Sequence, residues 1–182
     1  MNIPNLLTLL RILLVPLIVI FLIDEAYLKA LITFFISGIT DALDGFLARL
    51  LHQKTVLGAY LDPIADKALL VTCFLTLSIE GIIPGWLTVV VISRDVIILT
   101  GTFILFMMSV SFEIKPILIS KVTTALQIIT VLLVLILKSL PGSFDYSWLL
   151  FLYWLTALFT IISGLKYISV GMKHYSEASQ QG

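Results

Sequence analysis

The hydrophobic positions of this chain fall into six long stretches separated by short polar connectors. They cover approximately residues 6–23, 27–51, 58–79, 82–108, 117–140 and 148–170. Each stretch is near or above the roughly 20 apolar residues that a helix needs to cross a bilayer. Backbone polar groups inside lipid must bond within their own element. The pattern therefore predicts an all-α integral membrane protein built as a bundle of six transmembrane helices.

The connectors between the stretches leave no room for a soluble domain. Pro84 and Gly85 open the fourth stretch, and Pro141 and Gly142 end the fifth, as expected of residues that break helices. We expect a single six-helix membrane domain over residues 1–172. A polar cytoplasmic tail over residues 173–182 is expected to fray. The N-terminus is interpreted as the first membrane element and not as a cleavable signal peptide, because Arg11 falls inside its apolar run.

Composition agrees with a membrane protein. Hydrophobic residues make up 60% of the 182 positions and charged residues only 12%, whereas about a quarter of a soluble domain is charged. The net charge is zero and no basic block is present, so a nucleic-acid partner is not indicated. The single cysteine, Cys73, excludes an internal disulfide and is expected to be buried in its apolar run.

Lysine and arginine residues near the ends of the stretches indicate the orientation, since they accumulate on the cytoplasmic side. With the N-terminus inside, the cytoplasmic side carries Arg49, Lys54, Lys115, Lys121 and Lys173. The outer side carries two lysines and most of the remaining acids, namely Lys29, Lys138, Asp24, Glu25, Glu80 and Asp145. This bias predicts a protein of the cytoplasmic (inner) membrane, with the hairpin between the second and third stretches facing the cytoplasm.

That hairpin holds a group of aspartates. They are Asp41, Asp44, Asp62 and Asp66. Spacings of three and four residues place each pair on one face of a helix, and the short turn at residues 52–55 makes the two helices antiparallel neighbours. Four carboxylates so close would take up protons unless positive charge compensated them. Arg49 and Lys67 are nearby, but two cations do not balance four anions.

Short acidic side chains suit a hard divalent cation such as Mg²⁺ or Mn²⁺. Two such ions roughly 3.5–4 Å apart are an arrangement used for displacement at phosphorus. Small residues stand between the acids, at Gly45, Ala48, Gly58 and Ala59. They would let a bulky group approach, or simply let the helices pack closely. Arg49 is by type a bidentate phosphate binder.

Structural alternatives exist for each charged pair. Asp62, followed by Pro63, could be a helix N-cap with proline at the first helical position, and Arg94 could be a local partner of Asp95. Four converging acids favour a functional site, because ionisable groups in a membrane are costly. A cation transporter is a distant alternative, disfavoured because the acids occupy one hairpin with no symmetric second half. A purely structural membrane subunit would not need four aspartates together.

The spacing of these residues resembles the complete signature of the CDP-alcohol phosphotransferase family. The matching positions are Asp41, Asp44, Gly45, Ala48, Arg49, Gly58, Asp62 and Asp66. Two further segments, "IPNLLTLLR" (residues 3–11) and "ISRD" (residues 92–95), resemble motifs of the phosphatidylglycerophosphate synthases and cardiolipin synthases within that family. The resemblance covers nearly the whole chain.

The resemblance implies transfer of a phosphatidyl group from CDP-diacylglycerol to an acceptor alcohol, with release of CMP. It implies a metal site for two ions, held by Asp41, Asp44, Asp62 and Asp66. Asp66 would also be the general base. The CDP-binding residues it implies are Asn5, Gly45, Ala48, Arg49 and Gly58. The resemblance further suggests a homodimer within the lipid bilayer.

The acceptor is less clearly indicated. The stretch "ISKVTTALQ" (residues 119–127) has Ser120 and Thr123 where phosphatidylglycerophosphate synthases usually carry glycine and lysine, and it is closer to the pattern of cardiolipin synthases. We expect glycerol 3-phosphate as the acceptor, with phosphatidylglycerol as the alternative. Candidates for binding the acceptor phosphate are Arg94, Lys115 and Lys121, although the two lysines could be only membrane-surface anchors.

Overall fold

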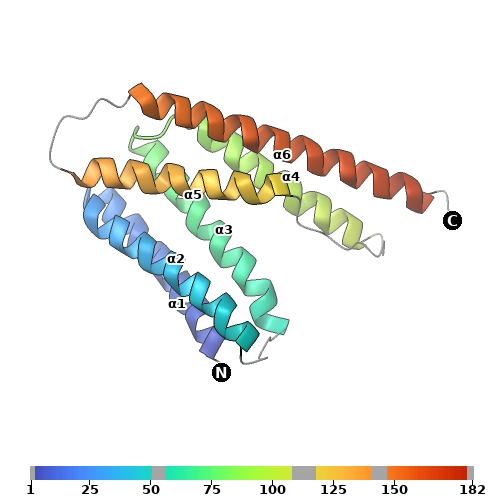
Figure 1. Cartoon of the computed structure of the whole chain (residues 1–182), viewed down its shortest axis with the longest axis horizontal. Helices are drawn as coiled ribbons and strands as arrows, with labels where there is room; N and C mark the ends of the chain where they lie inside the picture. The colour runs from blue at the N-terminus through green and yellow to red at the C-terminus, as the bar shows by residue number, and fades with distance from the viewer. Residues whose placement is uncertain (1–2, 51–55, 108–117, 141–146, 180–182) are drawn as a thin grey trace. The chain divides into compact units, whose positions relative to one another are not determined.

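The computed structural model of the chain describes residues 3–50, 56–107, 118–140 and 147–179. All regular structure in this part of the chain is helical (Figure 1). The helices are α1 (Ile3–Ile23), α2 (Tyr27–Leu50), α3 (Val56–Ile79), α4 (Gly85–Met107), α5 (Leu118–Ser139) and α6 (Ser147–Ser179). The six predicted helices are therefore present, each close to its apolar stretch.

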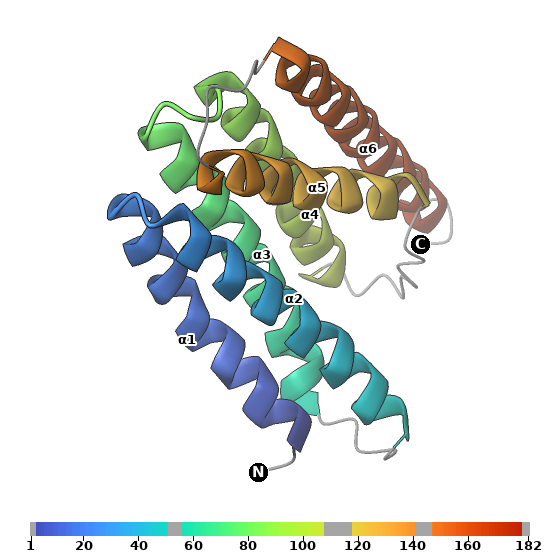
Figure 2. The same cartoon turned by 60° about the vertical axis from the view of Figure 1, so that its left-hand side comes forward.

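The helices belong to two compact units. The first unit comprises Met1–Ile83 with Val131–Phe144, and the second comprises Pro84–Thr130 with Asp145–Gly182, so α5 contributes to both. In the first unit α1 packs against both α2 and α3, as can be followed in Figure 2. Buried apolar side chains of α1 and α3 form part of its core, including Ile18, Leu22, Phe74 and Leu77. The predicted burial of Cys73 is confirmed.

Two of the connections are tight helix ends of the Schellman type. After α1, Glu25 adopts a left-handed conformation (φ 55°), and the amide of Ala26 donates to the carbonyl of Phe21. After α3, Gly81 adopts the same conformation (φ 69°), and Ile82 donates to Leu77. Both motifs satisfy carbonyls that a helix end would leave unpaired. They explain why α2 and α4 follow their predecessors after only a few residues.

In the second unit α4 packs against α6. Near their ends the rings of Trp86 and Trp154 lie 4.9 Å apart, centroid to centroid, with their planes inclined by 33°. The first part of α5 is joined to α6 by hydrogen bonds from buried polar side chains. Thr123 donates to the carbonyl of Phe159 over 3.0 Å, and the hydroxyls of Thr130 and Thr156 lie 2.9 Å apart.

Polar side chains of α6 are buried while many of its large apolar side chains are exposed. Its buried face carries Thr156, Thr160 and Ser163, which recur at helical spacing, beside Leu149, Tyr153 and Ala157. Its exposed face carries large apolar side chains, namely Leu150, Phe151, Trp154, Leu158, Ile161, Ile162 and Leu165. In water such a face would be costly, whereas in lipid it is neutral, and polar side chains become the groups that join helices. This distribution supports a membrane environment for α6.

Two described helices have the length and composition to cross a bilayer, Leu118–Ser139 and Ser147–Met172. A shorter apolar helix covers Leu9–Ile23. The all-helical fold is confirmed by the structure, while the crossing of the bilayer by all six helices stays a prediction. The turn at residues 52–55 and the Pro141–Gly142 pair lie outside the described residues.

Helix α6 continues to Ser179, so the polar residues that follow Met172 extend this helix, while the division at residue 172 into a membrane domain and a cytoplasmic tail stays a prediction. The alternative that Asp62 is an N-cap is wrong. Because α3 begins at Val56, Asp62 and Pro63 lie within the helix and not at its start.

The polar contact between α5 and α6 is testable at Thr156. The hydroxyl of Thr130 donates to the carbonyl of Leu126 over 2.8 Å, so its single hydrogen is used and Thr156 must donate to it. We expect Thr156→Val, which keeps the shape, to destabilise the protein by about 0.6–1.7 kcal/mol, measured by reversible unfolding in detergent micelles. Leu158→Ala, on the exposed face, is the matched control. An equal loss in both variants would contradict the role of the hydroxyl.

Candidate active site

The four aspartates singled out by the sequence lie on two continuous helices. Asp41 and Asp44 are in α2, and Asp62 and Asp66 are in α3. Because neither helix is interrupted between its two acids, spacings of three and four place each pair on one helical face. The side chains of Asp44 and Asp62 are not among those that the structure describes. The geometry of the site is therefore known only at Asp41 and Asp66.

These two carboxylates meet at one buried arginine. Arg11, from α1, has a side chain with 0% exposure. Its Nη1 donates to Oδ1 of Asp66 over 2.6 Å, and its Nη2 lies 2.8 Å from Oδ1 of Asp41. The side chains of Asp41 and Asp66 are 49% and 45% exposed. Acids from two helices therefore converge on a single guanidinium, and each keeps part of its surface accessible.

The part played by Arg11 is a correction to the sequence-based charge balance, which counted only Arg49 and Lys67 as cations. Arg11 was missed because it stands in an apolar run and its partner Asp66 is 55 positions away. A signal was nonetheless present in the sequence. A lone arginine within an apolar helix is costly unless it finds an acid, and the hairpin holds the largest group of aspartates in the chain.

The two described carboxylates fit a divalent cation by their chemistry. Mg²⁺ and Mn²⁺ prefer carboxylate oxygens and keep part of their hydration, and Asp41 of α2 and Asp66 of α3 offer such oxygens on half-exposed side chains. Among the side chains that the structure describes, no group of three or more potential metal ligands is present. Asp44 and Asp62, the other two predicted ligands, are not among those side chains.

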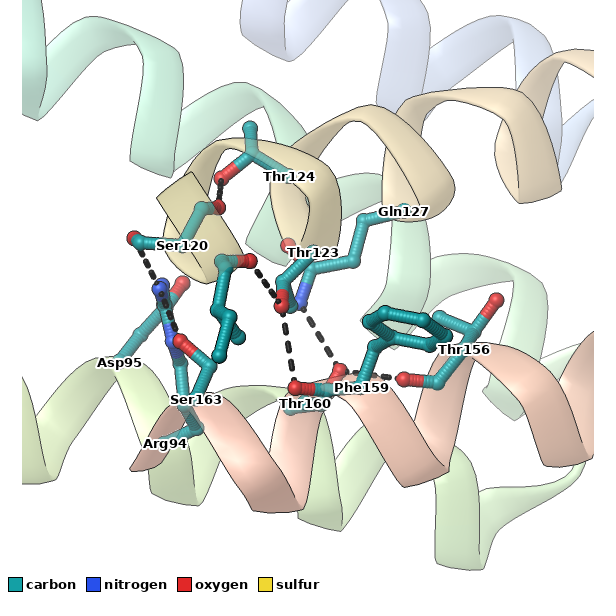
Figure 3. Close-up of polar contacts among 11 residues, drawn as sticks. Arg94, Asp95, Ser120, Thr123, Thr124, Gln127, Thr156, Phe159, Thr160 and Ser163 are labelled. Atoms are coloured by element: carbon teal, nitrogen blue, oxygen red, sulfur yellow. Dashed lines mark hydrogen bonds and ion pairs between the residues drawn. The ribbon is translucent and has the colours of Figure 1, made fainter. Parts of the chain in front are cut away.

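Arg94, a candidate for binding the acceptor, is buried in the second unit with 4% exposure. Its Nη1 donates to Oδ1 of Asp95 over 2.7 Å, and its Nη2 donates to Oγ of Ser163 over 3.0 Å and to Oγ of Ser120 (Figure 3). The pairing with Asp95, which the sequence left open, is confirmed. Arg94 thus ties α4 to both α5 and α6.

Small and aromatic residues of α6 complete the surroundings of Arg94. A Cβ atom added to Gly164 would lie 3.6 Å from the Cγ of Arg94, an ordinary van der Waals distance, so the stem of the arginine packs beside this part of α6. The ring of Tyr167 has its centroid 5.9 Å from the Cζ of Arg94, within the range of a cation–π contact. The guanidinium of Arg94 is therefore enclosed by side chains of α4, α5 and α6.

The remaining predicted residues are only partly described. Lys121 is exposed in the first turn of α5, whereas Lys115 lies outside the described residues. The side chains predicted to bind CDP, those of Asn5, Ala48 and Arg49, are not described, and the same holds for the surroundings of Gly45 and Gly58. Their roles stay predictions.

Residues 1–162 match the CDP-alcohol phosphatidyltransferase family. The chain belongs to this family, whose members are membrane-associated enzymes. The matched region contains all four aspartates and Arg11. The family that the aspartate spacing indicated is therefore confirmed.

Relatives of two kinds are similar to the chain. A rat protein named cardiolipin synthase (CMP-forming) is 36% identical over 94% of the chain and 62% of its own length. A Bacillus subtilis protein named CDP-diacylglycerol–glycerol-3-phosphate 3-phosphatidyltransferase is 34% identical over 92% of the chain and 94% of its own length. One of the same name from Aquifex aeolicus is 36% identical over 76% of the chain. The chain thus spans less than two thirds of the rat relative and nearly all of the Bacillus one.

The buried pair in the second unit can be tested by substitution. We expect Arg94→Met to destabilise the protein by about 3–5 kcal/mol, because it leaves the buried Asp95 without its cation. The double variant Arg94→Met/Asp95→Asn should recover part of that loss. Unfolding in detergent micelles measures both. Lys121→Met, which removes an exposed cation from the same unit, is the control and should change stability by less than about 0.5 kcal/mol; a loss as large as that of Arg94→Met would contradict the assignment.

Proposed function

We propose that this protein transfers the phosphatidyl group of CDP-diacylglycerol to a glycerol-type acceptor with release of CMP. One observation carries the proposal. In a chain that belongs to this family, the carboxylates of Asp41 in α2 and Asp66 in α3 both contact the guanidinium of Arg11. Similarity to relatives named for this class of transfer supports it. A cation pathway has no comparable support.

In the proposed reaction a hydroxyl oxygen of the acceptor attacks the phosphorus that carries diacylglycerol. The bond from that phosphorus to the oxygen of CMP breaks, and CMP leaves with the electron pair. The hydroxyl proton passes to the carboxylate of Asp66, which acts as general base. Asp66 is suited to this because it is held by Arg11 on one side while 45% of its side chain remains exposed.

The proposed cofactor is Mg²⁺ or Mn²⁺, with two ions expected from the family resemblance. These ions would be held by Asp41, Asp44, Asp62 and Asp66. When bound, they would offset the negative charge that develops on the transferring phosphate. The CDP group would be held by Asn5 and Arg49, with Gly45, Ala48 and Gly58 making room for it. Arg49 offers two parallel donors to a phosphate.

The environment fits a lipid substrate. We propose that six helices cross the cytoplasmic (inner) membrane as one domain over residues 1–172, with the active site facing the cytoplasm and residues 173–182 as a cytoplasmic tail. The acyl chains would stay in lipid while the headgroup reaches the aspartates. The apolar exposed faces of α1 and α6 support contact with lipid. Pairing as a homodimer through membrane helices is part of the proposal.

For the acceptor we propose glycerol 3-phosphate, which would give phosphatidylglycerophosphate. Phosphatidylglycerol, which would give cardiolipin, is the second candidate, and a specific observation favours it. Gln127 matches the pattern of cardiolipin synthases, and Thr123 stands where phosphatidylglycerophosphate synthases usually carry a lysine. Both side chains are fully buried and bonded between α5 and α6. In this chain the Thr123 hydroxyl instead forms a hydrogen bond from α5 to α6. Lys121 remains the exposed cation of this segment.

The transfer is tested by CMP release from CDP-diacylglycerol with Mg²⁺. We expect activity that a chelator abolishes, and a fall in kcat of about 10²–10⁴-fold in Asp66→Asn, since this is the usual contribution of a general base. Lys29→Gln is the control and should keep its activity, because Lys29 is far from the aspartates. A helix rises 1.5 Å per residue, so Lys29 lies roughly 18 Å from Asp41 along α2. Full activity of Asp66→Asn, or indifference to chelators, would exclude the proposed chemistry.

The acceptor is tested by mass spectrometry of the lipid product, with glycerol 3-phosphate and phosphatidylglycerol supplied in turn. We expect phosphatidylglycerophosphate as the main product. Cardiolipin alone would establish the second candidate. Turnover with neither acceptor would exclude both assignments, although membership of the family would stand.

A further inference from the structure

Arg11 is the one residue of its helical turn that faces inward. Its neighbours Leu9, Leu10, Ile12 and Leu13 are all exposed, Leu13 to 69%, whereas Arg11 has no exposed surface. In a soluble helix the distribution would be reversed. In lipid, the apolar neighbours face the acyl chains and the charge must be placed inside the protein. The sequence around Arg11 therefore directs the guanidinium toward α2 and α3.

The guanidinium contacts both acids. Nη1 donates a hydrogen bond to Oδ1 of Asp66, and Nη2 forms an ion pair with Oδ1 of Asp41 without hydrogen-bond geometry. The two nitrogens of a planar guanidinium have a fixed separation, so these contacts limit how far apart the two carboxylates can lie. A lysine has a single nitrogen, and it could neutralise charge here without imposing the same geometry.

Burial separates the role of Arg11 from that of the acids. Asp41 and Asp66 are about half exposed, while Arg11 lies fully behind them. A substrate phosphate can therefore reach the carboxylates without touching the arginine. Moving both acids away would leave the buried charge of Arg11 uncompensated, which is strongly unfavourable. Removing the arginine would remove the cation that contacts both acids, and their mutual repulsion would no longer be offset by it.

We propose that Arg11 is a positioning residue for phosphatidyl transfer. Its buried guanidinium holds Asp41 and Asp66 in the relative orientation that the reaction requires, so α1 is part of the catalytic unit. The proposal rests on the proposed function. A divalent ion would then meet two carboxylates that are already arranged, and would not have to bring repelling groups together.

Steady-state kinetics with varied CDP-diacylglycerol test the proposal in Arg11→Lys and Arg11→Met, with Lys29→Gln as the control for loss of a cation in the same unit. Arg11→Lys keeps the charge but not the two-pronged geometry. We expect its kcat to fall at least about tenfold with KM changed by less than about threefold, because small misplacements of reacting groups cost up to about 10²-fold. Arg11→Met should lose more. An unchanged kcat in Arg11→Lys, or a rise in KM alone, would overturn the proposal.

A second measurement does not depend on activity. Thermal unfolding in detergent with EDTA is compared for wild type, Arg11→Met, Asp66→Asn and the double variant. If Arg11 holds Asp66, the loss of Tm in the double variant will be clearly smaller than the sum of the two single losses. Additive losses would overturn the proposal. Absence of CMP release from the wild type would refute the proposed function. The comparison of the single and double variants would still decide whether Arg11 holds the acids.

Discussion

A charged side chain that cannot reach water must find an opposite charge inside the protein, and much of the first unit follows from this constraint at Arg11. The arginine sits in an apolar helix whose neighbouring residues face outward. Its ion pairs with Asp41 and Asp66 connect α1 to α2 and α3, the same helices against which α1 packs. Packing and charge neutralisation therefore favour the same arrangement, and the acids are brought together by a residue that is itself hidden.

The second unit solves the same problem with other residues. Arg94 is buried against Asp95, Ser120 and Ser163, and buried threonines with Gln127 join α5 to α6. Apolar side chains face outward along α6. In a bilayer the hydrophobic effect does not hold helices together, so hydrogen bonds and small residues such as Gly164 take over part of that task. Arg94 is thus accounted for by its contacts within the protein, whereas Lys121 is exposed at the start of α5.

Membership of the CDP-alcohol phosphatidyltransferase family connects this architecture to phospholipid chemistry. Relatives named for glycerol 3-phosphate and for cardiolipin are 34% and 36% identical to the chain over the regions that align. The family match itself covers the hairpin of aspartates. The segment that begins α5 combines an exposed lysine, Lys121, with the buried side chains of Thr123 and Gln127, which make contacts between helices.

The sequence alone determined the properties that depend on local spacing. Apolar run lengths predicted the six helices, and intervals of three and four residues placed Asp41 with Asp44 and Asp62 with Asp66 on common faces. The end of α6 at Ser179 and the position of Asp62 inside α3 escaped prediction, because hydropathy and single capping residues do not report where backbone hydrogen bonding stops. Only the tertiary structure decided that Arg11 serves Asp41 and Asp66, and that Arg94 reaches Ser120 and Ser163. Those pairs join residues far apart in the chain, and no local pattern specifies which buried charge meets which partner once the helices have packed.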